Sequence, residues 1–197
     1  AVESRIIEIE DRWRHANWQV SLNGEARELG VPQTDAIEDA SRTSDLVVTV
    51  SDRHPPLGRG YQLYTMKPDG SEQRRITRDG LNVHARLSPD GQTVAYLHAE
   101  KGAADIRVSS TNGTDERVVY QSEAKTMLGN GACWSPDGKY LAMAIFEAPD
   151  GVTGVNDGAP AELRNGRLLI TSADGKFRKE VAPAALHVLD LGFLDWQ

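Results

Sequence analysis

The chain has 197 residues, of which 39% are hydrophobic and 26% are charged, and its net charge at pH 7 is −7. This length and apolar content suffice for one domain with a buried core. The acidic balance argues against nucleic acid as a partner, because no basic surplus exists to displace counterions. The sequence contains no apolar run of about eighteen residues, so it predicts no membrane-spanning helix.

One strand–turn–strand unit recurs four times along the chain. Each copy has an alternating run, an Asn-Gly or Asp-Gly turn and a second extended run, and the turns end at Gly24, Gly70, Gly113 and Gly175. Such turns are strong hairpin signals, because these residues adopt positive φ at low cost. The glycines are 46, 43 and 62 residues apart, a period typical of one four-stranded blade of a β-propeller.

A second turn, Ser-Pro-Asp-Gly, occurs at 88–91 and 135–138, and we expect 42–45 to occupy the same place in an earlier copy. The longest interval contains an insertion loop at 147–166, rich in Gly, Pro, Asn and Asp. Loops of that length in compact domains are often binding loops. We predict a single β-propeller domain over 1–197, with blade-like repeats at about 18–52, 61–98, 105–147 and 167–197 plus 1–11.

The two ends of the chain complement one another. Residues 193–197 resemble the run before a Ser-Pro-Asp-Gly turn, and residues 1–11 resemble the run after it, so that joining them puts Trp196 in the place of Trp134. We therefore expect the N- and C-terminal strands to pair and close a ring of about four four-stranded blades, which leaves no open edge. The alternatives are a fragment of a larger propeller and a homodimer that closes an eight-bladed ring.

These repeats resemble the WD40-like repeat of the TolB family, whose blades carry Trp-Ser-Pro-Asp-Gly, an alternating strand and an Asx-Gly hairpin. The resemblance extends from about Trp18 to Trp196 and implies an all-β propeller. Propellers of this kind occur in TolB, a periplasmic protein-binding component, in non-catalytic domains of prolyl-oligopeptidase-like peptidases and in metal-dependent oligogalacturonate lyases, so function stays open. The resemblance implies a periplasmic or secreted location, with the cytoplasm as the alternative; the chain starts on Ala1, as a mature exported form or a trimmed chain would.

Several enzyme signatures are absent from the sequence. No Gly-x-Gly-x-x-Gly, Walker loop, His-Glu-x-x-His or Gly-x-Ser-x-Gly occurs, which removes most named enzyme classes. The single cysteine, Cys133, excludes an internal disulfide and a cysteine-based metal knuckle.

The histidines fall in or beside the connections on the face opposite the turns. Trp and Arg often dominate binding energy at interfaces, and this face has both. The candidate binding residues are Trp13, Arg14, His15, Arg53, His54, His84, His187 and Asp190. Of these, we expect His84, His187 and Asp190 to point into the mouth of the central channel.

Three interpretations of this face compete. The one we favour is a non-catalytic module without a cofactor that binds a protein or peptide rather than a small molecule. The second is a metal-dependent lyase or hydrolase acting on a sugar acid, with a divalent metal held by histidines and a carboxylate such as Asp190, Glu38 or Asp39. No histidine pair has i,i+2 or i,i+4 spacing, so no metal ligand is assigned. In the third, the histidines share no site.

Overall fold

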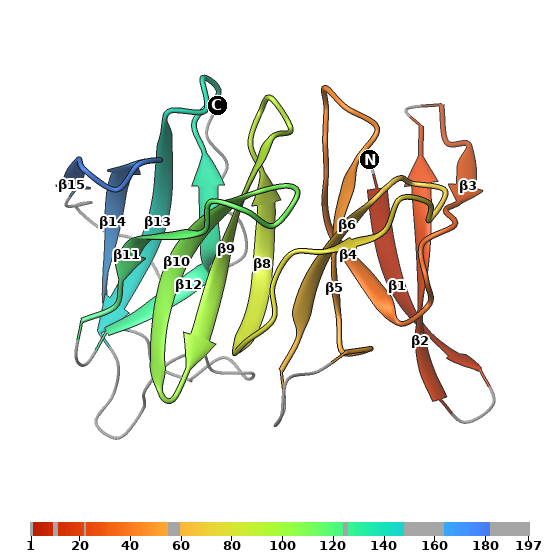
Figure 1. Cartoon of the computed structure of the whole chain (residues 1–197), viewed down its shortest axis with the longest axis horizontal. Coiled ribbons are helices and arrows are strands. Elements are labelled where there is room, and N and C mark those ends of the chain that lie inside the picture. The colour runs from red at the N-terminus through yellow and green to blue at the C-terminus, as the bar shows by residue number, and fades with distance from the viewer. Residues whose placement is uncertain are drawn as a thin grey trace.

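The computed structural model describes residues 2–9, 12–21, 23–54, 60–123, 126–147 and 164–181, with the backbone alone for 2–9, 12–14 and 164–165. Every regular element in these ranges is a β-strand, as expected for an all-β chain. The strands form four antiparallel sheets that succeed one another along the long axis of the molecule (Figure 1).

Each sheet is built from strands consecutive in sequence. The first contains β1 (Val2–Ile9), β2 (Arg12–Val20) and β3 (Ala26–Glu28), and the second contains β4 (Asp35–Ala40), β5 (Val47–Ser51), β6 (Gln62–Met66) and β7 (Arg74–Arg75). The third contains β8 (Leu81–Leu87), β9 (Thr93–Glu100), β10 (Ala103–Ser110) and β11 (Arg117–Gln121). The fourth contains β12 (Thr126–Trp134), β13 (Tyr140–Glu147), β14 (Arg164–Ser172) and β15 (Arg178–Val181). The repeats expected at 18–52, 61–98 and 105–147 have the right period, but each spans the end of one sheet and the start of the next.

The antiparallel order gives the molecule two distinct rims. The turns after β4, β8 and β12, together with the Asx-Gly hairpins, lie on one rim, which we call the turn rim (Figure 1). The connections from β5 to β6 and from β9 to β10 leave from the other ends of these strands, with described residues 52–54, 60–61 and 101–102, and we call that side the opposite rim. This is the arrangement expected from the two kinds of turn in the sequence.

Hydrogen bonds correct the position of the earliest turn by one residue. The backbone N–H of Ser41 donates to Leu46 O at 2.8 Å, as that of Ser88 does to Thr93 O and that of Ser135 to Tyr140 O. Residues 41–44, and not 42–45, are therefore equivalent to Ser-Pro-Asp-Gly. The prediction was wrong because this copy lacks Pro and Gly, whereas the shared feature is a serine whose backbone N–H donates to the carbonyl five residues later. The Ser41 hydroxyl accepts from the N–H of Thr43 and of Ser44.

The core lies between the sheets. Successive residues of a strand point to opposite faces, so Val47 packs in the cluster against the first sheet and Val48 in the cluster against the third. A third cluster between the third and fourth sheets contains Leu97, Trp134 and Leu141. Each central sheet is buried on both faces, as a propeller blade is.

The first sheet has three described strands, of which β1 hydrogen-bonds to β2 alone. The order of turns makes β1 the equivalent of β5, β9 and β13, so the innermost position of this sheet has no described strand. Residues 193–197, which we expect to fill it, lie outside the described residues. Ring closure therefore stays a prediction.

Candidate binding rim

The four described histidines lie at different depths. His54 is exposed in the connection after β5, whereas His98 lies within β9 with 2% of its surface exposed. His15 and His84 are half-buried within β2 and β8. Of these four side chains, His54 is the exposed one on the opposite rim.

Other candidates lie in strands or outside the described residues. The backbones of Trp13 and Arg14 belong to β2, where they pair with Glu8 and Ile7, rather than to a connection. Their side chains, His187, Asp190 and residues 148–163 of the insertion lie outside what the structure describes.

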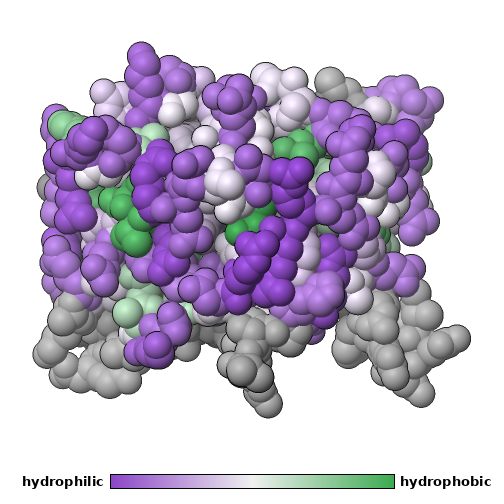
Figure 2. Space-filling model, viewed as in Figure 1, coloured by the Kyte–Doolittle hydropathy of each residue, from purple (hydrophilic) through white to green (hydrophobic). Residues whose placement is uncertain are grey.

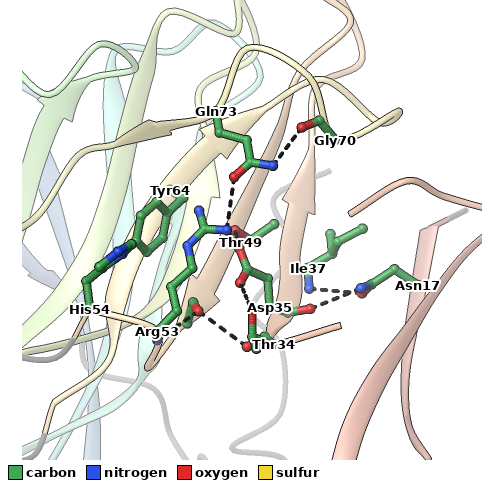
Figure 3. Close-up of polar contacts among 11 residues, drawn as sticks. Asn17, Thr34, Asp35, Ile37, Thr49, Arg53, His54, Tyr64, Gly70 and Gln73 are labelled. Atoms are coloured by element: carbon green, nitrogen blue, oxygen red, sulfur yellow. Dashed lines mark hydrogen bonds and ion pairs between the residues drawn. The ribbon is translucent and has the colours of Figure 1, made fainter. Parts of the chain in front are cut away.

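Arg53 is held by a buried carboxylate at the start of β4 (Figure 3). Asp35 is 0% exposed, and its Oδ2 lies 3.3 Å from Arg53 Nη1. Two hydroxyls also donate to this carboxylate, from Thr49 at 3.1 Å and from Thr34 at 2.9 Å. A buried carboxylate needs such partners to offset the loss of hydration. The ion pair with Asp35 in turn fixes the position of the Arg53 guanidinium.

The guanidinium of Arg53 also stacks on an aromatic ring. Its Cζ lies 3.8 Å from the centroid of the Tyr64 ring, within the range of a cation–π interaction. Its Nη1 donates to Gln73 Oε1 at 3.0 Å, and its Nε is buried without a hydrogen-bond partner among the described residues. The side chain is 16% exposed. From its backbone in the β5–β6 connection, it extends along the sheet toward Gln73 of the β6–β7 hairpin (Figure 3).

His54 adds exposed contact surface beside this stack, and Tyr61 is exposed at the other end of the same connection. Nδ1 of His54 lies 2.9 Å from the hydroxyl of Tyr64, and Tyr61, which precedes β6, is 48% exposed. The structure thus brings together Arg53 and His54 from the sequence-based set. Sequence reasoning missed Asp35, Tyr61 and Tyr64, because an isolated aspartate and strand tyrosines carry no motif; an aromatic residue at the end of a connection was the one signal for Tyr61.

A second polar group lies on the inner strands. His84 lies within β8 rather than ahead of it, at a break in register, with φ of 57°. The backbone N–H of His84 donates to Glu38 Oε1 at 3.3 Å, and Arg86 Nη1 donates to the backbone carbonyl of Glu38 at 2.9 Å. A Cβ on Gly131 of the next inner strand would lie 2.8 Å from His84 Cβ. Three neighbouring inner strands therefore meet closely at this level.

Burial dominates the electrostatics of this inner group. It raises the pKa of Glu38, while the His84 N–H and Arg86 act in the opposite direction. Burial lowers the pKa of the His84 imidazole, and Arg86 lowers it further. Within the described ranges, no three His, Cys, Asp or Glu side chains are placed to hold a metal ion. The described residues thus do not by themselves fit a metal centre.

Repeated four-stranded sheets with adjacent inner strands define a β-propeller repeat protein. No family model matches the chain. Over 80 residues it is 30% identical to tricorn protease homolog 1 of Streptomyces coelicolor, and over 77 residues it is 29% identical to the Tol-Pal system protein TolB of Geobacter sulfurreducens. These matches cover 40% and 39% of the chain but 7% and 17% of the relatives.

Solved structures give the same fold. A putative TolB from Agrobacterium tumefaciens superposes with a TM-score of 0.67 at 16% identity, over 91% of this chain and 60% of that one. An oligogalacturonate lyase in complex with manganese superposes with a TM-score of 0.58, over 42% of its length. At such identities the likeness shows the fold alone. Together with the two relatives, it points to a TolB-like β-propeller repeat family, which confirms the resemblance drawn from the turns.

No helix long and apolar enough to cross a bilayer occurs in the part of the chain that the structure describes.

Proposed function

We propose that the chain is a non-catalytic binding module that engages a protein or peptide through the opposite rim of a TolB-like propeller. The observation that carries the proposal is the stack of Arg53 on Tyr64, held by buried Asp35, with exposed His54 against Tyr64 and exposed Tyr61 at the far end of the same connection. Arg and Tyr are enriched among residues that dominate binding energy. Preorganised side chains lose little entropy on binding, which favours affinity.

The relatives agree with this proposal in kind. One of them is a Tol-Pal system protein named TolB, and protein binding is what the TolB resemblance implies. The same resemblance supports a periplasmic or secreted location. The chain spans a small part of both relatives, so partner and location are part of the proposal.

The test is selection of peptides from a displayed library against the immobilised chain. Peptides that bind the wild type should bind His54→Ala and Tyr61→Ala at least about tenfold more weakly, the cost of losing one anchor. Neither change touches the buried Asp35 pair, so folding should be retained. The matched control is Tyr140→Ala, which removes a tyrosine 37% exposed at the start of β13, on the turn rim. Loss with Tyr140→Ala but not with the other two variants would contradict the proposal.

A metal-dependent lyase or hydrolase is the second candidate. It is favoured by the meeting of Glu38 and His84 on adjacent inner strands and by the manganese-bound lyase among the structural neighbours. Elemental analysis of the purified, tag-free protein separates the two candidates. Near one transition metal per chain, lost in His84→Ala, would favour the enzyme over the binding module.

Ring closure is also part of the proposal. No described strand pairs with the free edge of β1, which is the innermost position of the first sheet. Residues 193–197 would supply that strand and close a ring of about four blades. Light scattering tests the alternatives. A monomer whose stability falls when 191–197 are deleted supports closure within one chain, whereas a dimer would favour the eight-bladed ring.

A further inference from the structure

A pocket of about 530 Å³ opens between the first and second sheets, beside the turn that follows β4. Its lining is mixed. Four of its apolar residues, Leu29, Ile37, Ala40 and Val47, belong to the core cluster of these two sheets, and polar side chains such as Gln19, Ser41 and Ser44 complete the walls. The pocket is therefore on the turn rim, away from Arg53 and His54.

The pocket lies where other sheets place a large side chain. Ala40 pairs with Val47 as Leu87 pairs with Val94 and Trp134 with Leu141, so the three residues are equivalent. Leu87 is 7% exposed and Trp134 is 9% exposed, whereas Ala40 is only half-buried.

Trp134 shows what this position can hold. Its indole lies between the third and fourth sheets, and its Nε1 donates to Arg86 O at 3.0 Å. The groove that Trp134 itself lines is smaller, about 370 Å³. Ala40 has a methyl group where Trp134 has an indole, so space for a ring is left between the first and second sheets.

Charge at the pocket favours a cation. Three carboxylates, of Glu38, Asp39 and Asp45, line it together with one guanidinium, of Arg42. Asp39 Oδ2 accepts from the N–H of Leu87 in the third sheet at 2.9 Å, and Glu38 Oε2 lies 3.9 Å from Arg86 Nη1, so part of this negative charge is already compensated. Charge complementarity at a binding site gives selectivity and faster association for the ligand of matching charge.

We propose that this pocket binds an aromatic side chain of a partner protein that has a Lys or Arg beside it. The ring would occupy the space that Trp134 fills two sheets later, and the cation would lie against the carboxylates. This contact is separate from the opposite rim, so it adds a second recognition site to the module.

The probe is tryptamine, which joins an indole to an ammonium group. Titration followed by amide NMR should shift resonances within 37–47, and indole-3-acetate, which carries the opposite charge, should bind at least about fivefold more weakly. Ala40→Leu and Ala40→Trp should each weaken tryptamine binding at least tenfold. Both should fold, because Leu87 and Trp134 occupy the equivalent positions.

Ala26→Leu is the matched control, because Ala26 is an exposed residue of β3; tryptamine should bind this variant as it binds the wild type. Three results would overturn the proposal: no binding to the wild type, unchanged binding to Ala40→Leu, or equal affinity for indole-3-acetate.

Discussion

The Arg53 guanidinium and the Tyr64 ring are stacked, with 3.8 Å between Arg53 Cζ and the ring centroid. Arg53 lies in the β5–β6 connection, two residues after β5 ends, and Tyr64 lies within β6, the strand that follows. The stack therefore orders the base of that connection at the opposite rim. Asp35, from the neighbouring strand, fixes the orientation of the charge.

Arg53→Ala should destabilise the fold by about 3 kcal/mol, because it leaves the fully buried Asp35 without its ion-pair partner. Urea denaturation measures the change. Arg167→Ala is the control, since it breaks an ion pair with Glu180 in which both side chains are more than a third exposed, and it should cost less than about 1 kcal/mol. Equal effects of the two substitutions would disprove the structural role given to Asp35.

Gly80→Ala should cost at least about 2 kcal/mol of unfolding free energy. Gly80 has φ of 55°, and an added Cβ would lie 2.4 Å from His98 Cε1 and 2.8 Å from Ala99 O. Gly24→Ala is the control, because Gly24 also has positive φ but nothing within 4 Å of the added Cβ. It should cost about 1 kcal/mol, the left-handed backbone penalty alone. Thermal melts measure both costs, and equal costs for the two variants would contradict the close packing of His98 on Gly80.

Trp134→Ala should cost about 3–5 kcal/mol, since it removes a buried ring and its hydrogen bond to Arg86 O. Tyr140→Ala, at the partly exposed position next to the same turn, should cost about 1 kcal/mol. The measurement is the urea midpoint at constant slope. A small effect of Trp134→Ala would mean that the indole does not join the third and fourth sheets.

The unfolding free energy of Glu38→Gln, relative to that of the wild type, should increase as pH rises. The folded pKa of Glu38 is raised by burial, so above the ordinary carboxyl range the folded state holds more protons than the unfolded state. The contribution of Glu38 to stability then falls as pH rises through the folded pKa, and glutamine removes that loss.

Urea denaturation from pH 4 to pH 8 tests this. The difference between Glu38→Gln and wild type isolates Glu38 from His84, whose lowered pKa has the opposite effect on stability with pH. Glu25→Gln, at an exposed position, controls for the loss of one charge. A difference that stays flat or falls with pH would contradict the burial of Glu38.

Much of the architecture could be predicted from turns because turns are local. Ser-Pro-Asp-Gly and Asx-Gly determine the hairpins by backbone conformation alone, and the strands between them follow. The turn at 41–44 was misplaced by one residue, since it shares with the other copies only the serine and the backbone hydrogen bond from that serine to Leu46 O. Because the turn was misplaced, the equivalence of Ala40 and Trp134 was missed; it follows from their pairing with Val47 and Leu141 on the next strand.

The site was harder to predict because its contacts join distant segments. His54 and Arg53 lie in a connection and were recognised there. Asp35, which holds Arg53, comes from another strand and has no sequence signal of its own. His98 ends an alternating run, which predicts a position at the rim. In the structure it pairs with Asn82 and is buried inside the third sheet.

Hydrogen exchange on the complex with a library-selected peptide tests the central claim most directly. The account predicts slower exchange at 52–54 and 60–64 on the opposite rim, with no change at 135–140 on the turn rim. Protection confined to 135–140, with 52–54 and 60–64 unaffected, would contradict it.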